Sequence, residues 1–279
     1  MNFLIDNYST HDNSQPMYLH TAFFNMEYEG VLSDIAANSV FDLFDTIKPD
    51  IVITSAQRLN KETMFYMKEN ADLGIRLLLN VDNLNKENIE QLCDFMVMEE
   101  VIPSFMFSSN YTLPDKIKKI NIVKLLPAAD NNQISEPDFD YSIERGVIIN
   151  EEPEEMQYDS SFHVISTDPR MKDKADIVLP AIGLRSIYPK YNEIIIKNLK
   201  STTQVFFDAI LSGAKVYYQN SRDTGVQDKI NKIFKKDFNL DYNSDSKLQD
   251  FSEIKNIVNE KHTGDNRART ILSQIKGAK

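Results

Sequence analysis

The chain of 279 residues contains little cysteine, few histidines and no long apolar run. Cys93 is the only cysteine, which excludes a disulfide framework and a metal site built from thiolates. The four histidines, at positions 11, 20, 163 and 262, lack the spacing of a metal site. No apolar stretch approaches the roughly 18 residues that span a membrane. The start, Met1–Tyr8, becomes polar too quickly for a signal peptide. We therefore expect a cytoplasmic protein with no membrane partner.

The glycine signatures of nucleotide binding are also missing. The sequence has neither a Gly-x-Gly-x-x-Gly run nor a Walker sequence, so a standard dinucleotide site or P-loop is not expected. An apolar share of 42% and a charged share of 26% are typical of a globular protein. The length is sufficient for one large or two medium domains.

Charge is distributed unevenly along the chain, whose overall net charge is −11. Residues 1–130 carry 19 acidic and 10 basic side chains, a net charge of −9. Residues 131–160 carry nine acidic side chains and one basic side chain, a net charge of −8. Residues 161–279 carry 14 acidic and 20 basic side chains, a net charge of +6. An anionic ligand is therefore expected in the C-terminal half, with chance segregation of surface charge as the alternative explanation.

Short apolar segments alternate with helical patterns in the first half. The expected strands are Asn2–Asp6, Ile51–Thr54, Ile75–Asn80, Ser104–Phe107 and Ile122–Leu126. The expected helices are Ser33–Ile47, Lys61–Glu69 and Lys86–Met98. This alternation indicates a parallel sheet covered on both faces. Polar residues follow several of the strands, at the edge where open α/β sheets bind ligands. These residues are Asn7–Asp12, Ser55, Asn80, Asp82, Ser108 and Ser109.

The second half repeats the alternation after a polar, acidic stretch at 131–140. The expected strands are Gly146–Asn150, Phe162–Ser166, Glu193–Lys197 and Lys215–Tyr218. The expected helices are Ser201–Ser212, Lys229–Lys236, Phe251–Lys261 and Asn266–Ile275. We predict an α/β protein with two Rossmann-like domains, 1–135 and 136–279, facing across a cleft.

The clearest functional signal lies at the start of the helix expected after residue 200. Ser201, Thr202 and Thr203 are good N-cap residues, and Gly213 lies where that helix would end. A helix start offers unpaired N–H groups and a positive dipole end, which suit a phosphate. Asp208 lies about two turns inside, where its carboxylate could reach ribose hydroxyls of the same ligand. An ordinary capped helix explains the same pattern.

Residues 125–279 resemble the donor domain of GT-B glycosyltransferases, particularly the group-1 and CgeB-like proteins. The run Asp208-Ala-Ile-Leu-Ser-Gly213, followed by a strand, is similar to a family run whose glutamate holds the ribose of a nucleotide sugar. Aspartate replaces that glutamate here, which shortens the reach. The turn Leu126–Asp130 resembles the end of the family's first domain, and His262-Thr263 resembles the start of its C-terminal helix. The first half resembles the family only in fold.

This resemblance implies hexosyl transfer from a nucleoside diphosphate sugar, with UDP-glucose as the expected donor. A helix start and a basic side chain can neutralise the leaving diphosphate without a metal. Arg185 and Lys190 are the candidate cations, and each is also explained as a solvated loop residue. No cofactor is required, and a divalent metal is compatible but not implied. An inverting enzyme needs a general base. His11 and Asp12 are the candidates, with a structural turn as the alternative for His11.

The acceptor is suggested by a second resemblance. Small GT-B enzymes rich in Asn, Lys and Ile resemble those that T-even-like bacteriophages use to glucosylate hydroxymethylcytosine in DNA. One type adds glucose to an already glucosylated base, which implies action in a host cytoplasm. Arg222, Lys229, Lys232 and Lys236 are the candidate DNA-binding residues, and a solvated helix face is the alternative. Two rival functions remain: a bacterial transferase acting on a surface saccharide or protein, and a non-catalytic nucleotide-sugar-binding module.

Overall fold

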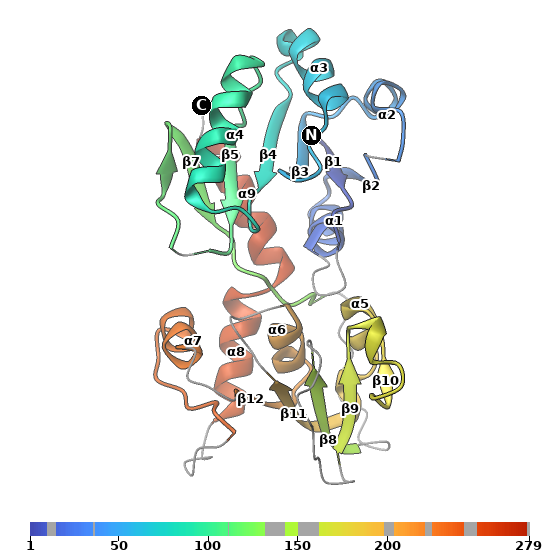
Figure 1. The fold of residues 1–279 in the computed structure, drawn as a ribbon, viewed down its shortest axis with the longest axis vertical. Helices are drawn as coiled ribbons and strands as arrows, with labels where there is room; N and C mark the ends of the chain where they lie inside the picture. Colours follow the sequence, from blue (N-terminus) through green and yellow to red (C-terminus); the bar gives the residue numbers. More distant parts are fainter. Residues whose placement is uncertain are drawn as a thin grey trace. The chain divides into compact units, whose positions relative to one another are not determined.

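The computed structural model describes residues 1–9, 15–35, 37–110, 112–131, 143–149, 162–197, 204–220, 225–242 and 250–277. These residues form two α/β units, each with its own sheet (Figure 1). Unit 1 comprises Met1–Ser9, Gln15–Leu126 and Arg267–Lys279, and unit 2 contains Pro127–Asn266. The sequence analysis expected the division at residue 135 and assigned residues 267–279 to the second domain. In the structure these last residues group with unit 1.

Unit 1 is built on a seven-stranded sheet with the order β2-β1-β3-β4-β5-β7-β6. Its strands are β1 (Asn2–Asp6), β2 (Glu29–Ser33), β3 (Ile51–Ser55), β4 (Arg76–Asn80), β5 (Phe105–Ser108), β6 (Lys116–Ile117) and β7 (Ile120–Lys124). Its helices include α1 (Gln15–Asn25), α2 (Val40–Ile47), α3 (Lys61–Glu69), the short η1 (Ala71–Leu73) and α4 (Lys86–Met98). Neighbouring strands are parallel except β6 and β7, which pair antiparallel.

Local side chains determine where the helices of unit 1 begin. The side chains of Ser39, Asn60 and Asn85 accept hydrogen bonds from backbone N–H groups in the first turns of α2, α3 and α4. The left-handed Lys48 (φ 48°) ends α2 just before Pro49. These boundaries are encoded within a few residues of sequence.

The predicted elements of unit 1 agree with the structure to different degrees. The strand at Asn2–Asp6 and the helices at Lys61–Glu69 and Lys86–Met98 are confirmed with the predicted bounds. The helix predicted from Ser33 was wrong at its start, because Ser33 ends β2 and α2 begins only at Val40. The sequence analysis also missed α1 and β2. The first has no Asp, Glu, Lys or Arg to mark a polar face, and the second is a partly exposed edge strand without a clear apolar run.

Unit 2 is built on a five-stranded sheet, entirely parallel, with the order β10-β9-β8-β11-β12. Its strands are β8 (Ile143–Ile149), β9 (Phe162–Ser166), β10 (Ile177–Val178), β11 (Tyr191–Lys197) and β12 (Lys215–Gln219). Its helices include η3 (Pro169–Met171), α5 (Ala181–Leu184), η4 (Tyr188–Lys190), α6 (Gln204–Leu211), α7 (Val226–Phe234) and α8 (Phe251–Lys261). The strand at Phe162–Ser166 and the helix at Phe251–Lys261 are confirmed with the predicted bounds.

Glycine has a backbone role at two places in unit 2. Gly213 adopts φ 95° two residues after the end of α6, which confirms it as the left-handed residue that follows that helix. In β8, a Cβ added to Gly146 would lie only 3.0 Å from the Tyr191 ring of β11. Glycine therefore leaves space for this ring beside β8.

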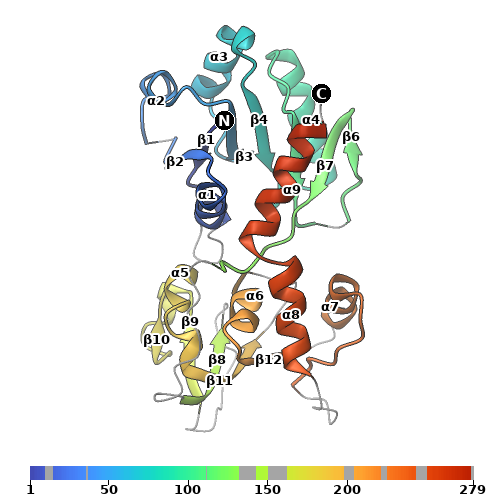
Figure 2. The ribbon, with the colours of Figure 1, turned by 180° about the vertical axis from the view of Figure 1, so that it is seen from behind.

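The last helix, α9 (Gly264–Gly277), returns to unit 1 (Figure 2). The Arg76 guanidinium in β4 donates to the Ile275 carbonyl, 3.0 Å away. The buried Arg267 donates through Nε to the Leu126 carbonyl, 2.7 Å away. These two arginine contacts join α9 to β4 and to the segment after β7, both far away in the sequence.

Candidate functional site

Unit 2 has a topological switch point between β8 and β11. The chain adds β9 and β10 on one side of β8, then returns to place β11 and β12 on the other side. Open α/β sheets of this order bind ligands where the strand order reverses, at the carboxyl ends of the strands. β11 ends at Lys197, and α6 starts at Gln204. Ser201, Thr202 and Thr203 fall between them, outside the described residues, so their role in phosphate binding stays a prediction.

The helix that follows this point, α6, is enclosed by the unit. Seven of its eight residues, Gln204–Ile210, are buried. Phe207 stacks on His262 with ring centroids 5.1 Å apart, and Phe234 of α7 packs edge-on against both rings. The helix is therefore held from several sides, and the position of its first turn is fixed by the core.

Asp208 of α6 belongs to a buried cluster of three charged side chains. Its Oδ1 accepts a hydrogen bond from the Asp130 backbone N–H at 2.8 Å, and its Oδ2 lies 3.6 Å from Arg185 Nε. Arg185 Nη1 donates to Asp130 Oδ2 at 2.6 Å. Asp130, Arg185 and Asp208 are exposed by only 1, 4 and 1%. We call these three residues the buried triad. Its formal charge is −1 with all three groups ionised.

Burial controls the acid–base behaviour of the buried triad. Desolvation raises the pKa of Asp208 to about 7, although the Arg185 charge and the Asp130 N–H act in the opposite direction. Two favourable partners thus offset only part of the cost of burying this carboxylate. The neighbouring Tyr188 is fully buried, and its hydroxyl has no hydrogen-bond partner among the described residues. Burial, together with the nearby Asp208 charge, raises the pKa of Tyr188 well above its ordinary value.

The structure therefore brings two of the predicted donor-binding residues together. Arg185 and Asp208 lie inside unit 2 and bind each other through the buried triad. The sequence marks Asp130 only as part of a turn, and no local signal pairs it with Arg185 and Asp208, which lie 55 and 78 positions away. Lys190, by contrast, is exposed at the end of η4. Contact of these residues with a nucleotide sugar stays a prediction.

Two segments selected by the family resemblance lie side by side in unit 2. The Ala129 N–H donates to the His262 carbonyl and the Gly264 N–H donates to the Ala129 carbonyl, both at 2.8 Å. Ala129 and Thr263 form a parallel β-bridge. This bridge and the buried triad hold the segment around Ala129 from two directions.

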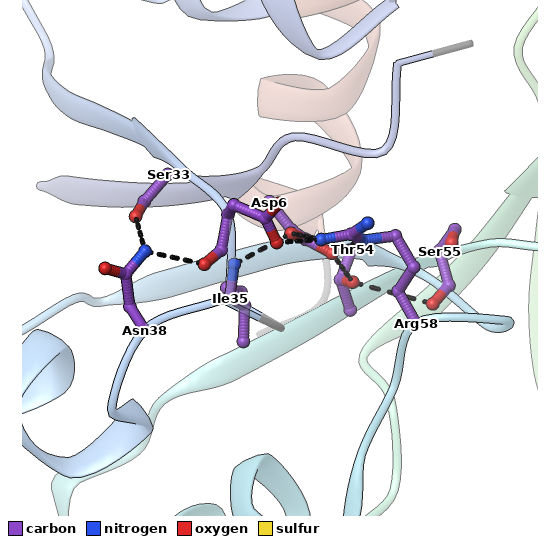
Figure 3. A network of polar contacts seen from close by, with 8 residues as sticks. Asp6, Ser33, Ile35, Asn38, Thr54, Ser55 and Arg58 are labelled. Carbon is purple, nitrogen blue, oxygen red and sulfur yellow. Dashed lines mark hydrogen bonds and ion pairs between the residues drawn. The ribbon is translucent and has the colours of Figure 1, made fainter.

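Unit 1 has its own switch point, between β1 and β3. Figure 3 shows Asp6 at the centre of a polar network at this edge. The fully buried Asp6 carboxylate accepts from Ile35 N–H at 3.1 Å, from the Thr54 hydroxyl at 2.7 Å, and from Arg58 at 2.9 and 3.2 Å. Arg58 Nη2 also pairs with Asp34. We call Asp6, Asp34, Thr54 and Arg58 the switch-point network.

A second network follows the carboxyl ends of β1, β4 and β5. The Tyr8 hydroxyl and Asn80 Nδ2 donate to the same oxygen, Oε1 of Gln15, at 2.8 and 2.7 Å. Asn80 also bonds to Asp82, whose other oxygen accepts from Ser108. The sequence analysis selected Asn80, Asp82 and Ser108 for their place after strands, and the structure brings them together.

The remaining candidates are less constrained by the structure. His11 and Asp12 lie between Ser9 and Gln15, and Arg222 lies between β12 and α7; all three fall outside the described residues, and their roles stay predictions. The other candidate DNA-binding residues are exposed in and just after α7: they are Lys229, Lys232 and Lys236. Lys236 Nζ pairs with Glu253 at 2.5 Å.

Neither a metal centre nor a membrane helix is found in the part of the chain that the structure describes. Its His, Cys, Asp and Glu side chains form no group of three that could hold a metal ion. None of its helices combines the length and the apolar character needed to cross a membrane.

Comparison with solved structures identifies the fold. The glycosyltransferase SsfS6 of Streptomyces sp. SF2575, solved with thymidine diphosphate, matches 98% of this chain with 99% of its own, at a TM-score of 0.51 and 10% identity. The glycosyltransferase SnogD of Streptomyces nogalater matches 98% of this chain with 98% of its own, also at 0.51 and 10%. No protein-family model and no curated protein matches the sequence. The chain has the α/β, GT-B fold of these enzymes, as predicted.

Proposed function

We propose that this protein is a glycosyltransferase that moves a hexose from a nucleoside diphosphate sugar onto a hydroxyl group. The observation that carries the proposal is the fold shared over 98% of the chain with two glycosyltransferases. A fold hosts many functions, so the proposal also needs a site on this chain. Unit 2 offers one in the segment between β11 and α6.

The donor site is proposed at the start of α6. In the sequence, Ser201–Thr203 lie between β11, which borders the switch point of unit 2, and α6, which the core holds in place. Backbone N–H groups and the helix dipole at such a position stabilise the charge that develops on a leaving diphosphate. Lys190 adds an exposed positive charge in the same unit, whereas the charge of Arg185 is balanced within the buried triad. Asp208 is the proposed partner of the ribose. UDP is the proposed nucleotide, and the thymidine diphosphate bound to SsfS6 makes TDP the first competitor to test.

The proposed chemistry is a displacement at the anomeric carbon. In an inverting transfer, the acceptor oxygen forms a new bond to the anomeric carbon while the bond between this carbon and the diphosphate oxygen breaks. The electron pair of the broken bond leaves with the diphosphate, and a general base takes the hydroxyl proton. His11 and Asp12, which follow β1 in the sequence, are the proposed bases.

A ligand screen tests the donor site. A ligand at 100 times its Kd raises the free energy of unfolding by about 2.7 kcal/mol, so UDP, TDP and their glucose conjugates should raise Tm if they bind. Replacing Ser201, Thr202 and Thr203 together by alanine should abolish this rise, while Ser273→Ala on the exposed face of α9 should not. Asp208→Ala should weaken UDP binding by about 1.5–3 kcal/mol in calorimetry. An unchanged Kd would remove Asp208 from the ribose site.

Turnover separates a transferase from a binding module. Release of the nucleoside diphosphate and transfer of radiolabelled hexose should both require the native Ser201–Thr203 sequence. Hexose transfer should persist in the presence of a metal chelator, because a helix start and basic side chains can neutralise the diphosphate without a metal ion. Binding of the sugar nucleotide without turnover on any acceptor would favour the non-catalytic module.

We further propose hydroxymethylated cytosine in phage DNA, including the already glucosylated base, as the acceptor. The resemblance to small phage enzymes supports it, as do the exposed lysines around α7, since phosphate contacts by lysine supply most of the non-specific affinity for DNA. The assay is transfer from UDP-glucose onto hydroxymethylcytosine DNA with and without prior glucosylation. Incorporation only into a saccharide or protein would support the bacterial alternative.

A further inference from the structure

Asp6 and Asp82 both lie at the carboxyl edge of the unit 1 sheet, and their partners differ. Asp6 is fully buried and neutralised by Arg58, so its oxygens are occupied within the protein. Asp82, after β4, is half-buried and forms no ion pair among the described residues. Both carboxylates are held by hydrogen bonds, but only Asp82 keeps its negative charge near the surface.

Three donors fix the orientation of Asp82. Oδ1 accepts from the Ser108 hydroxyl at 3.1 Å and from the Ser109 backbone N–H. Oδ2 accepts from Asn80 Nδ2 at 3.1 Å. Since a carboxylate offers about four acceptor positions, these contacts use three of them and leave one on Oδ2.

The groups around Asp82 are themselves held in place. Asn80 is buried; its Oδ1 accepts the Asp82 backbone N–H at 2.9 Å, and its amide hydrogens go to Gln15 and Asp82. The fully buried Ser108 hydroxyl accepts from the Asn110 N–H at 3.1 Å while it donates to Asp82. A ligand hydroxyl would therefore meet an acceptor whose direction is already set, which reduces the entropy cost of binding.

The charge of the Asp82 carboxylate determines which chemical class of ligand can bind to it. A carboxylate without a cationic partner repels phosphates and carboxylates, and it binds neutral donors through charge-assisted hydrogen bonds. Sugar hydroxyls are donors of this kind. We infer that Asp82, oriented by Asn80 and Ser108, binds a hydroxyl of the sugar or polyol acceptor at the carboxyl edge of unit 1. The inference rests on the proposed function, because it assigns a role in acceptor binding.

Direct sugar binding tests this inference separately from catalysis. Methyl β-D-glucopyranoside is the probe, and binding to the full chain is measured by saturation-transfer NMR without any nucleotide. The wild-type protein should bind it, and Asp82→Asn should lower the affinity about tenfold to a hundredfold, because a charged hydrogen-bond acceptor is replaced by a neutral amide. Asp82→Glu should restore part of the affinity. Asp72→Asn, in the exposed η1 before β4, is the matched control and should bind like the wild type.

Each outcome decides the inference. Loss of sugar binding by Asp82→Asn, with an unchanged Tm and unchanged UDP affinity, supports a hydroxyl-binding role. Equal sugar affinity in the wild type and in Asp82→Asn overturns it, as does the absence of any wild-type binding at saturating probe. A lower Tm with equal loss of sugar and UDP binding in both Asp82→Asn and Asp82→Glu assigns Asp82 to structure alone and also overturns it. The proposed function fails on different results, namely no nucleotide binding and no transfer.

Discussion

The switch-point network and the buried triad each contain a buried aspartate paired with an arginine. The two clusters differ in the number of hydrogen bonds to the aspartate and in the exposure of the arginine. Asp6 receives four hydrogen bonds from three residues, and the Arg58 side chain remains 28% exposed. Asp208 receives one backbone hydrogen bond and an arginine 3.6 Å away, and that arginine is shared with Asp130 in a fully buried place. The free-energy cost of burying each carboxylate therefore depends on how many hydrogen-bond donors it has and on how far its arginine stays exposed to water.

The largest expected effect comes from removing the cation of the buried triad. Arg185→Met leaves Asp130 and Asp208 buried together without a counter-charge, so the free energy of unfolding should fall by about 3–5 kcal/mol. Urea unfolding monitored by circular dichroism measures it. Arg145→Met, at an exposed arginine of the same unit, is the control and should cost less than about 1 kcal/mol. Equal losses for the two variants would contradict the difference between buried and exposed pairs.

A dependence on pH should follow from Asp208. Its folded-state pKa of about 7 lies above the ordinary value of 3.8, so the folded protein binds this proton more tightly than the unfolded chain does. The Asp208 contribution to stability should therefore be fully present below about pH 4 and be lost as the pH rises through about 7, by about 4 kcal/mol in total. The measurement is the difference in unfolding free energy between the wild type and Asp208→Asn from pH 4 to 8. A constant difference would remove Asp208 as the titrating group.

Removing the cation of the switch-point network should have a smaller effect. Arg58→Met leaves Asp6 with the Ile35 N–H and the Thr54 hydroxyl, and water can approach the vacated side. The expected loss is about 1.5–3 kcal/mol, the range for hydrogen bonds to a charged group. The same urea titration measures it. A loss above that of Arg185→Met would reverse the proposed order of the two clusters.

The smallest effect on stability is expected at an exposed pair. Lys236 and Glu253 form an ion pair in which both side chains are at least 40% exposed, and such pairs contribute about 0–1 kcal/mol. Reversing charge at Lys232 and Lys236 should therefore leave Tm almost unchanged. If the α7 lysines bind DNA, the same variant should bind DNA more weakly and with a shallower salt dependence, while UDP affinity stays the same. Unchanged DNA binding would leave these lysines as a solvated face.

Much of the fold could be predicted because its signals are local. An unbroken run of apolar residues marks β1 and β3, and N-cap side chains at Asn60, Asn85 and Asp250 mark where α3, α4 and α8 begin. The order of strands and helices along the chain was sufficient to predict a parallel α/β fold in two parts. These features depend on residues a few positions apart, so the conformational preferences of those residues can be read from the sequence.

The site was predictable only in part, because its contacts join distant segments. The sequence pointed to Arg185, Asp208, Asn80 and Asp82. It carried no sign that Asp208 would be buried against the Asp130 backbone, or that Asp82 would pair with no cation among the described residues. The return of α9 to unit 1 likewise depends on Arg76 and Arg267, each of which bonds to a carbonyl more than a hundred residues away. Local preference determined the elements, whereas desolvation and pairing, which exist only once the chain is packed, decided which charges were buried and which remained available.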